Sequence, residues 1–238
     1  MSGHSKWSTI KHKKALLDSK RGRAFTKLIK EITICARVGG GDPNSNARLR
    51  LLVDKAKELN MPLENTARAI KRGTGELPGV HYEQYLYEGY GPYGIAIVID
   101  VLSDNKNKAA SEIRHLFTSR GGNLGESGSV SWMFEKLGVI HSLDTTMSED
   151  VLLEKLIDYD IKDIKQDESG VFIYCDIKSL DAVKKAVEAA GLKVEKAELE
   201  WVPKNTVSLS EEQAEKAYEF LDALEEQEDI QNVYTNLE

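Results

Sequence analysis

Residues 139–202, VIHSLDTTMSEDVLLEKLIDYDIKDIKQDESGVFIYCDIKSLDAVKKAVEAAGLKVEKAELEWV, carry the pattern that decides the fold of this chain. Four runs rich in β-branched and aromatic residues alternate with two stretches of helical period. The predicted strands are 139–142, 161–166, 171–177 and 192–201, and the predicted helices are 149–158 and 180–190. This is the βαββαβ order of a ferredoxin-like fold, so we expect one such unit here.

The residues on either side of this stretch predict a second unit of the same order. Its expected elements are a strand at 95–102, a helix at 106–119, a strand near 130–135, a strand at 206–209, a Ser210-capped helix to about residue 226, and a strand at 231–235. A further strand at 82–90 precedes them and is joined to the next by a turn at 89–94. The first unit therefore interrupts the second along the chain.

Before residue 80 the apolar residues follow a helical period. Residues 25–36 form one apolar stripe and are followed by Gly39–Pro43, which ends the helix. Further helices are expected around 7–17, along the stripe Leu49 to Leu59 with Asn44 or Asn46 as cap, and at 63–71. We predict an α+β fold: an N-terminal helical domain (1–79) followed by two ferredoxin-like βαββαβ domains, one (137–202) inserted in the other (80–136 plus 203–238).

The charge of the chain is divided between its two parts. The 238 residues include 32 Lys plus Arg and 39 Asp plus Glu, a net charge of −7. Residues 1–75 hold 17 basic and 6 acidic residues, whereas residues 76–238 hold 15 and 33. A basic block of this kind is typical of a segment that binds a polyanion, although a solvated helix face that keeps the protein soluble is the alternative.

The candidate nucleic-acid-binding residues belong to this basic block. They are Lys6, Trp7, Lys11, His12, Lys13 and Lys14 near the start, Lys20, Arg21, Arg23 and Lys27 further along the basic block, and Arg68, Lys71 and Arg72 on the short third helix. Cations contact phosphates and a flat ring can stack on a base. Trp7 has two interpretations, a stacking platform or the anchor of its own helix.

No catalytic or metal-binding pattern is found in the sequence. The five histidines are scattered, Cys35 and Cys175 lie far apart, and the zinc-protease, paired-cysteine and P-loop motifs are absent. We expect no enzyme activity, no cofactor, no metal and no catalytic residue. The polar loop at 121–129 is either mobile or a ligand or partner site. The absence of a long apolar run and of a signal peptide predicts a cytoplasmic protein without a membrane partner.

Several long motifs resemble one known family. The opening MSGHSKWSTIKHKK is followed by DSKRGR at 18–23, FTKLI at 25–29, GGGDP at 39–43, NARLR at 46–50, NMP at 60–62, RAIKRG at 68–73 and NLG at 123–125. Together they are similar to the YebC/PmpR family. Leu16 and Leu17 depart from the small or polar residues common there.

The resemblance implies a three-domain cytoplasmic bacterial protein that regulates gene expression. Members are usually described as DNA-binding transcriptional regulators, which is the function expected here. Others, including a mitochondrial translational activator, point to a ribosome-binding or ribosomal-RNA-binding translation factor that assists elongation, and this is the alternative. The acidic domains would then position the basic one or bind the ribosome or another protein.

Overall fold

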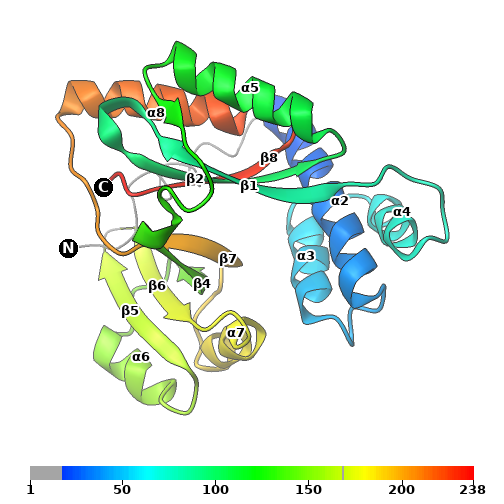
Figure 1. Ribbon diagram of the computed structural model, residues 1–238. Coiled ribbons are helices and arrows are strands. Elements are labelled where there is room, and N and C mark those ends of the chain that lie inside the picture. Colours follow the sequence, from blue (N-terminus) through cyan, green and yellow to red (C-terminus); the bar gives the residue numbers. More distant parts are fainter. Residues whose placement is uncertain (1–17, 168) are drawn as a thin grey trace.

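The computed structural model describes residues 18–167 and 169–238. The helix predicted around 7–17 lies outside the described residues. Three helices form one unit, and two four-stranded antiparallel sheets form the rest of the molecule. Figure 1 shows the helical unit at one side of the two sheets, with α4 on the side away from them. No helix within these described ranges combines the length and apolar character needed to cross a membrane.

The helical unit consists of α2 (Asp18–Gly39), α3 (Ala47–Glu58) and α4 (Leu63–Thr74). Its core contains Leu28, Ile32 and Leu49, all almost completely buried, so the predicted apolar stripes do face one another. The Asn46 side chain accepts a hydrogen bond from the Leu49 N–H at 3.0 Å and is the N-cap of α3. Helix α2 begins seven residues earlier than the stripe at 25–36 predicts, because the preceding residues are polar and carry no apolar period.

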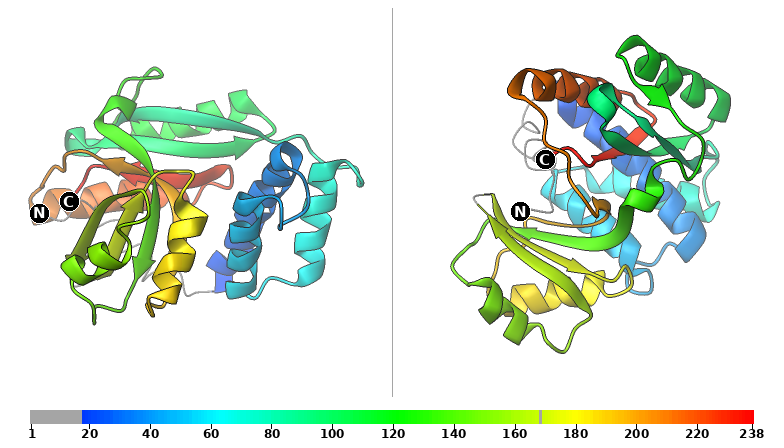
Figure 2. Two further views of the ribbon diagram at one scale, coloured as in Figure 1. Left: turned by 90° about the horizontal axis from the view of Figure 1, so that it is seen from below. Right: turned by 60° about the vertical axis from the view of Figure 1, so that its left-hand side comes forward.

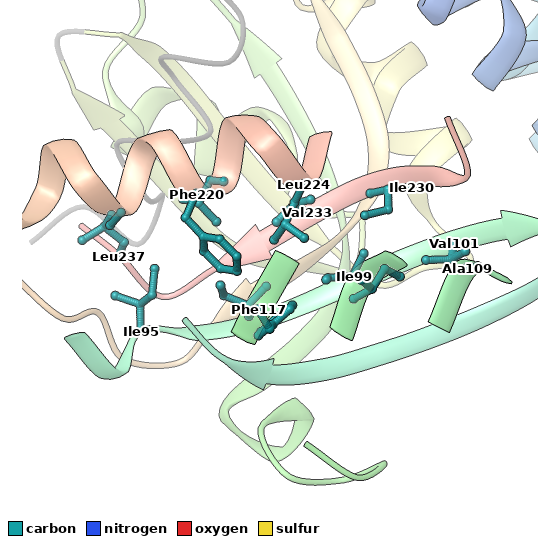
Figure 3. Packing of buried hydrophobic residues seen from close by; sticks show 14 residues of the cluster. Ile95, Ile99, Val101, Ala109, Phe117, Phe220, Leu224, Ile230, Val233 and Leu237 are labelled. Carbon is teal, nitrogen blue, oxygen red and sulfur yellow. The ribbon is translucent and has the colours of Figure 1, made fainter. Parts of the chain in front are cut away.

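The first sheet has the strand order β3-β1-β2-β8. Its elements are β1 (Glu83–Tyr90), the 3-10 turn η1 (Pro92–Gly94), β2 (Ala96–Ser103), α5 (Lys106–Ser119), β3 (Asn123–Leu124), α8 (Glu211–Glu225) and β8 (Ile230–Thr235). Helices α5 and α8 cover one face, as Figures 1 and 3 show. Phe117 and Phe220 meet edge to face at 5.1 Å between ring centroids in the core beneath them. This core is the largest continuous apolar contact described for the first sheet.

The strand predicted near 130–135 is not part of the first sheet. Residues Ser131–Met133 form a 3-10 turn, η2, and Phe134 begins a strand of the other sheet. The strand predicted at 206–209 is reduced to one bridge between Val207 and Leu237. Strand β1 takes the vacant central position, because its tight turn to β2 lets all eight of its residues pair with that neighbouring strand.

The second sheet has the order β5-β6-β4-β7. Its elements are β4 (Phe134–Ser142), α6 (Glu149–Lys155), β5 (Ile161–Asp167), β6 (Gly170–Cys175), α7 (Leu180–Ala189) and β7 (Lys196–Pro203). The βαββαβ order predicted from residues 139–202 is therefore confirmed. Strands β3, β1, β2 and β8 occupy the same relative positions as β5, β6, β4 and β7, with β1 brought from earlier in the chain.

The two sheets contact each other through the face of the first sheet that α5 and α8 leave open. Ala96 and Val98 of β2 pack against Phe134, and Trp201 of β7 lies against the same cluster. The Tyr234 hydroxyl donates to the Leu199 carbonyl oxygen at 3.3 Å across this contact. The domain limits 1–79, 80–136 plus 203–238 and 137–202 stay a prediction, because they require separate folding units as well as separate cores.

Candidate nucleic-acid interface

Most of the predicted basic segment at the start of the chain lies outside the described residues. Lys20 and Arg21 belong to the first turn of α2, which shows that the basic run continues into a helix. The predicted site residues beyond the described ranges are Lys6, Trp7, Lys11, His12, Lys13 and Lys14. The interface can therefore be built only from the cations of α2, α3 and α4.

Two predicted site residues on α2 contact the C-terminal end of α8. Lys27 Nζ donates to the Glu225 carbonyl oxygen at 2.8 Å. Arg23 Nη1 lies 3.6 Å from Glu226 Oε1. Cations are stabilised at a helix C-terminus, where the last carbonyl groups point outward with partial negative charge. These two side chains therefore join α2 to the first sheet's layer of helices.

Lys30, one turn further along α2, makes a more buried contact of the same kind. Its Nζ donates to Asp229 Oδ1 at 2.7 Å and to the Glu228 carbonyl oxygen at 3.1 Å. Ser103 Oγ donates to the other Asp229 oxygen at 2.7 Å. Burial acts to raise the pKa of Asp229, but the hydrogen bonds from Lys30 and Ser103 outweigh it, and the pKa lies below its usual value.

Helix α3 is attached to the second sheet in a similar way. Arg50 Nη2 lies 2.8 Å from Asp181 Oδ2 at the start of α7, and the left view of Figure 2 shows these two helices side by side. Lys55 is paired with Glu198 of β7, which also accepts from Lys196 at 3.1 Å. Burial alone would raise the pKa of Glu198, but the two lysines hold it far below its usual range.

The three predicted residues of α4 remain on the outside of the molecule. Arg68, Lys71 and Arg72 are exposed and recur at the three- and four-residue spacing that places side chains on one helix face. Arg68 is shared with its own helix, since Nη2 donates to Asn65 Oδ1 at 2.8 Å. The Thr74 hydroxyl donates to the Lys71 carbonyl oxygen at 3.3 Å, but the charged groups of Lys71 and Arg72 form no ion pair or hydrogen bond with another described residue.

The position of α4 depends on a glycine. A Cβ at Gly73 would collide with the Thr33 carbonyl oxygen and would lie 2.8 Å from the Ala36 Cβ. The backbones of α4 and α2 therefore approach more closely than any other residue at position 73 allows. The last turn of α4, with Lys71 and Arg72, is fixed on α2 by this contact.

The C-terminal end of the loop at 121–129 is held in place by the carboxylate of Glu88. Glu88 of β1 accepts hydrogen bonds from the backbone N–H groups of Gly128, Val130 and Ser131 at 3.0, 3.0 and 2.8 Å. Burial acts to raise the pKa of Glu88, but the backbone hydrogen bonds outweigh this effect, and the pKa lies below its usual value. The loop carries Trp132, whose ring is 66% exposed, directly after its anchored end. The strand predicted near 130–135 would place Trp132 in a sheet as a core or interface aromatic, whereas the residue lies in η2.

Neither an exposed thiol nor a cluster of metal-binding side chains is found among the described residues. Both cysteines are buried and unpaired, and burial raises the pKa of Cys175 to about 12. Within residues 18–167 and 169–238, no three His, Cys, Asp or Glu side chains gather in a way that could hold a metal ion. The arrangement therefore provides an exposed basic surface on α4, and ion pairs join the helical unit that carries α4 to the two sheets.

Comparison with known proteins places the chain in a family. Residues 5–76 match the model of the TACO1/YebC N-terminal domain, and residues 82–237 match that of the TACO1/YebC second and third domain. A protein of Chlorobaculum tepidum named probable transcriptional regulatory protein is 52% identical over 239 residues, covering 100% of this chain and 95% of that protein. One of Persephonella marina with the same name is 51% identical over 240 residues, at 100% and 96% coverage.

A solved structure supports the same conclusion. The crystal structure of a conserved hypothetical protein from Aquifex aeolicus superposes with a TM-score of 0.86 at 46% identity. The match covers 96% of this chain and 95% of that one. The sequence, the order of the domains and the fold agree, and the chain belongs to the TACO1/YebC family.

Proposed function

We propose that this protein is a non-enzymatic regulator of gene expression that binds nucleic acid, with DNA as its favoured partner. The observation that carries the proposal is the exposed basic face of α4, formed by Arg68, Lys71 and Arg72. The names of the relatives from C. tepidum and P. marina agree with a role in transcription.

The ion pairs between the units narrow the surface available for phosphate. Arg23, Lys27, Lys30, Arg50 and Lys55 all contact residues of the two sheet-containing units. Their charge is taken up by these contacts within the molecule, whereas that of Lys71 and Arg72 faces solvent. We therefore assign the phosphate contacts of the described residues to α4, and we propose that the segment before α2 adds further ones.

The experiment compares duplex DNA with ribosomes. The variant combining Arg68→Ala, Lys71→Ala and Arg72→Ala should bind duplex DNA more weakly, and the log–log salt slope should fall by up to about 0.9 for each lost phosphate contact. The matched control combines Lys155→Ala, Lys178→Ala and Lys193→Ala, three exposed lysines of the second sheet's unit. An unchanged slope in the α4 variant would remove α4 from the interface.

Ribosomal RNA is the alternative partner, because lysine and arginine neutralise both kinds of phosphate. Co-sedimentation of the wild-type protein with ribosomes, set beside a genome-wide DNA pull-down, distinguishes the two. Enrichment on ribosomes without enrichment on DNA would replace the transcriptional function by a translational one. Enrichment on DNA alone supports the proposal as stated.

A further inference from the structure

A cavity of about 590 Å³ lies where the three units meet. Its walls include α2 and α3 from the helical unit, β2 and β8 from the first sheet, and β7 from the second. This volume lies within the usual range for small-molecule sites, and such sites occur preferentially between domains. Leu28, Leu52, Leu102 and Leu199 supply apolar wall. The cavity has no part in the nucleic-acid surface proposed above.

The charges that line the cavity are balanced. Six basic and six acidic side chains contribute to its walls. Several neutralise one another, as Lys55, Lys196 and Glu198 do. Glu31 and Arg48 form no ion pair or side-chain hydrogen bond with another described residue, and the lining charges Glu58 and Lys136 likewise form no ion pair within the described ranges. The cavity thus presents a carboxylate at Glu31 and a guanidinium at Arg48 that no described ion pair neutralises.

A β-bulge adds an available amide. The register between β2 and β8 shifts at Asp100 and Val101, so that Gln231 is an extra residue between Ile230 and Asn232. Bulges often redirect a side chain next to a functional site. Gln231 is only 8% exposed and lines the cavity, yet neither its side-chain nitrogen nor its oxygen has a hydrogen-bond partner among the described residues.

We propose that this cavity binds a short zwitterionic peptide, with Glu31 holding the ammonium group, Arg48 the carboxylate and Gln231 a peptide group. The Gln231 amide carries N–H donors and a carbonyl acceptor, so it can donate to a peptide carbonyl oxygen or accept from a peptide N–H. Each buried polar group that remains unpaired costs free energy, so a ligand that pairs with Gln231 recovers that cost. The neutral wall excludes ligands of large net charge, nucleotides included.

Electrostatic details support this assignment. Burial raises the pKa of Glu31, with Lys55 and Arg48 acting in the opposite direction. Burial also raises the pKa of Asp100, and Lys136 and Arg48 lower it. Arg48 lowers the pKa of both carboxylates, and all three side chains line the cavity. An ammonium group entering there gains one or two carboxylate partners.

A ligand at this location would also link the helical unit to the two sheets. A peptide in the cavity contacts α2, which carries the basic run, and both sheets at once. Binding would hold the helical unit against the other two by mass action, since the ligand favours the assembled state. The inference goes beyond the proposed function, because a peptide can bind whatever the nucleic-acid partner is.

The test uses the full-length protein without nucleic acid. Thermal unfolding and calorimetric titration are measured with Gly-X dipeptides, with the same peptides acetylated at the amino group or amidated at the carboxyl group, and with AMP. We expect a subset of free dipeptides to raise the Tm, and each blocked form to bind at least about tenfold more weakly, as loss of one charged hydrogen bond predicts.

Variants locate the site. Glu31→Gln, Arg48→Gln and Gln231→Leu should each weaken peptide binding by about tenfold or more. The controls Glu154→Gln and Lys178→Gln, on exposed side chains of the second sheet's unit, should leave it unchanged. Three results would overturn the proposal: no free dipeptide binding up to about 10 mM, blocked peptides that bind as well as free ones, or binding of AMP in place of peptides. The blocked peptides keep the test decisive even where a variant fails to fold.

Discussion

Lys30 of α2 and Asp229, just before β8, form an ion pair with 2.7 Å between Nζ and Oδ1, and the two side chains are only 8% and 17% exposed. The pair joins the basic part of the chain to the acidic part. The opposite net charges of residues 1–75 and 76–238 are therefore used for contacts within the molecule as well as for solvent-facing surface. A basic residue in this part of the chain can therefore hold the units together and need not contact nucleic acid.

Breaking this pair should destabilise the protein strongly. Lys30→Met leaves the Asp229 carboxylate without its cation, and removal of one partner of a buried pair costs about 3–5 kcal/mol. Lys57→Met is the control, because Lys57 pairs with Asp54 on the same helix and is 61% exposed. Its cost should stay below about 1 kcal/mol. Urea unfolding of both variants measures the difference, and equal costs would contradict the structural role of Lys30.

Acid should weaken the contact between α3 and β7. The folded-state pKa of Glu198 is lowered, so its contribution to stability is complete above the unfolded-state value of about 4.3 and is lost as the pH falls toward the folded-state pKa. Glu198→Gln should therefore flatten the dependence of the unfolding free energy on pH below about pH 4. Glu154→Gln, an exposed residue of α6, should leave the curve unchanged. A curve for Glu198→Gln that matches the wild type would exclude this linkage.

Two glycine substitutions should act in opposite directions. Gly73→Ala places a methyl group against Thr33 and Ala36 and should cost about 1–3 kcal/mol, as overpacked sites do. Gly22→Ala, on the exposed side of α2 with nothing within 4 Å of the added methyl group, should stabilise the protein by up to about 1 kcal/mol. Chemical denaturation reports both. A destabilising Gly22→Ala would show that helix propensity does not limit this part of α2.

Deletion of residues 1–17 should abolish nucleic-acid binding while the remaining chain still folds. The segment contributes four lysines, and we expect a terminal arm to add little to the core. Circular dichroism and melting should remain close to wild type, while duplex DNA affinity falls below the detectable range. Retained affinity after the deletion would assign binding to α4 alone.

The domain limits can be tested by expressing the inserted unit alone. Residues 137–202 carry a complete βαββαβ unit, but β4 begins at Phe134 and pairs through Lys136 with the end of β7. We expect both 137–202 and 134–203 to unfold cooperatively, with the longer segment melting at a higher temperature. An unfolded 134–203 segment would show that the unit depends on its neighbours for stability.

Local sequence patterns predicted most helices and strands, whereas contacts between distant residues determine which sheet a strand joins and which cations are buried. The stripe containing Leu28 and Ile32 and the cap at Asn46 depend on near neighbours, so the helices were predictable. The assignment of residues 130–135 to the wrong sheet arose because strand pairing is not encoded in the strand itself. Burial also depends on residues far away in the sequence. The sequence alone therefore does not show that Lys71 is exposed and Lys30 is buried.

The inserted unit leaves and rejoins the unit that contains the first sheet at adjacent points. Phe134 pairs with Pro203, and the Lys204 N–H donates to the Met133 carbonyl oxygen at 2.9 Å immediately outside the sheet. Neighbouring strands lie about 4.8 Å apart, so a two-residue turn can close the gap that removal of residues 134–203 would leave. A single recombination event could thus add or delete the whole unit without altering the connectivity of the sheet that receives it, which makes this junction a natural position for grafting another domain.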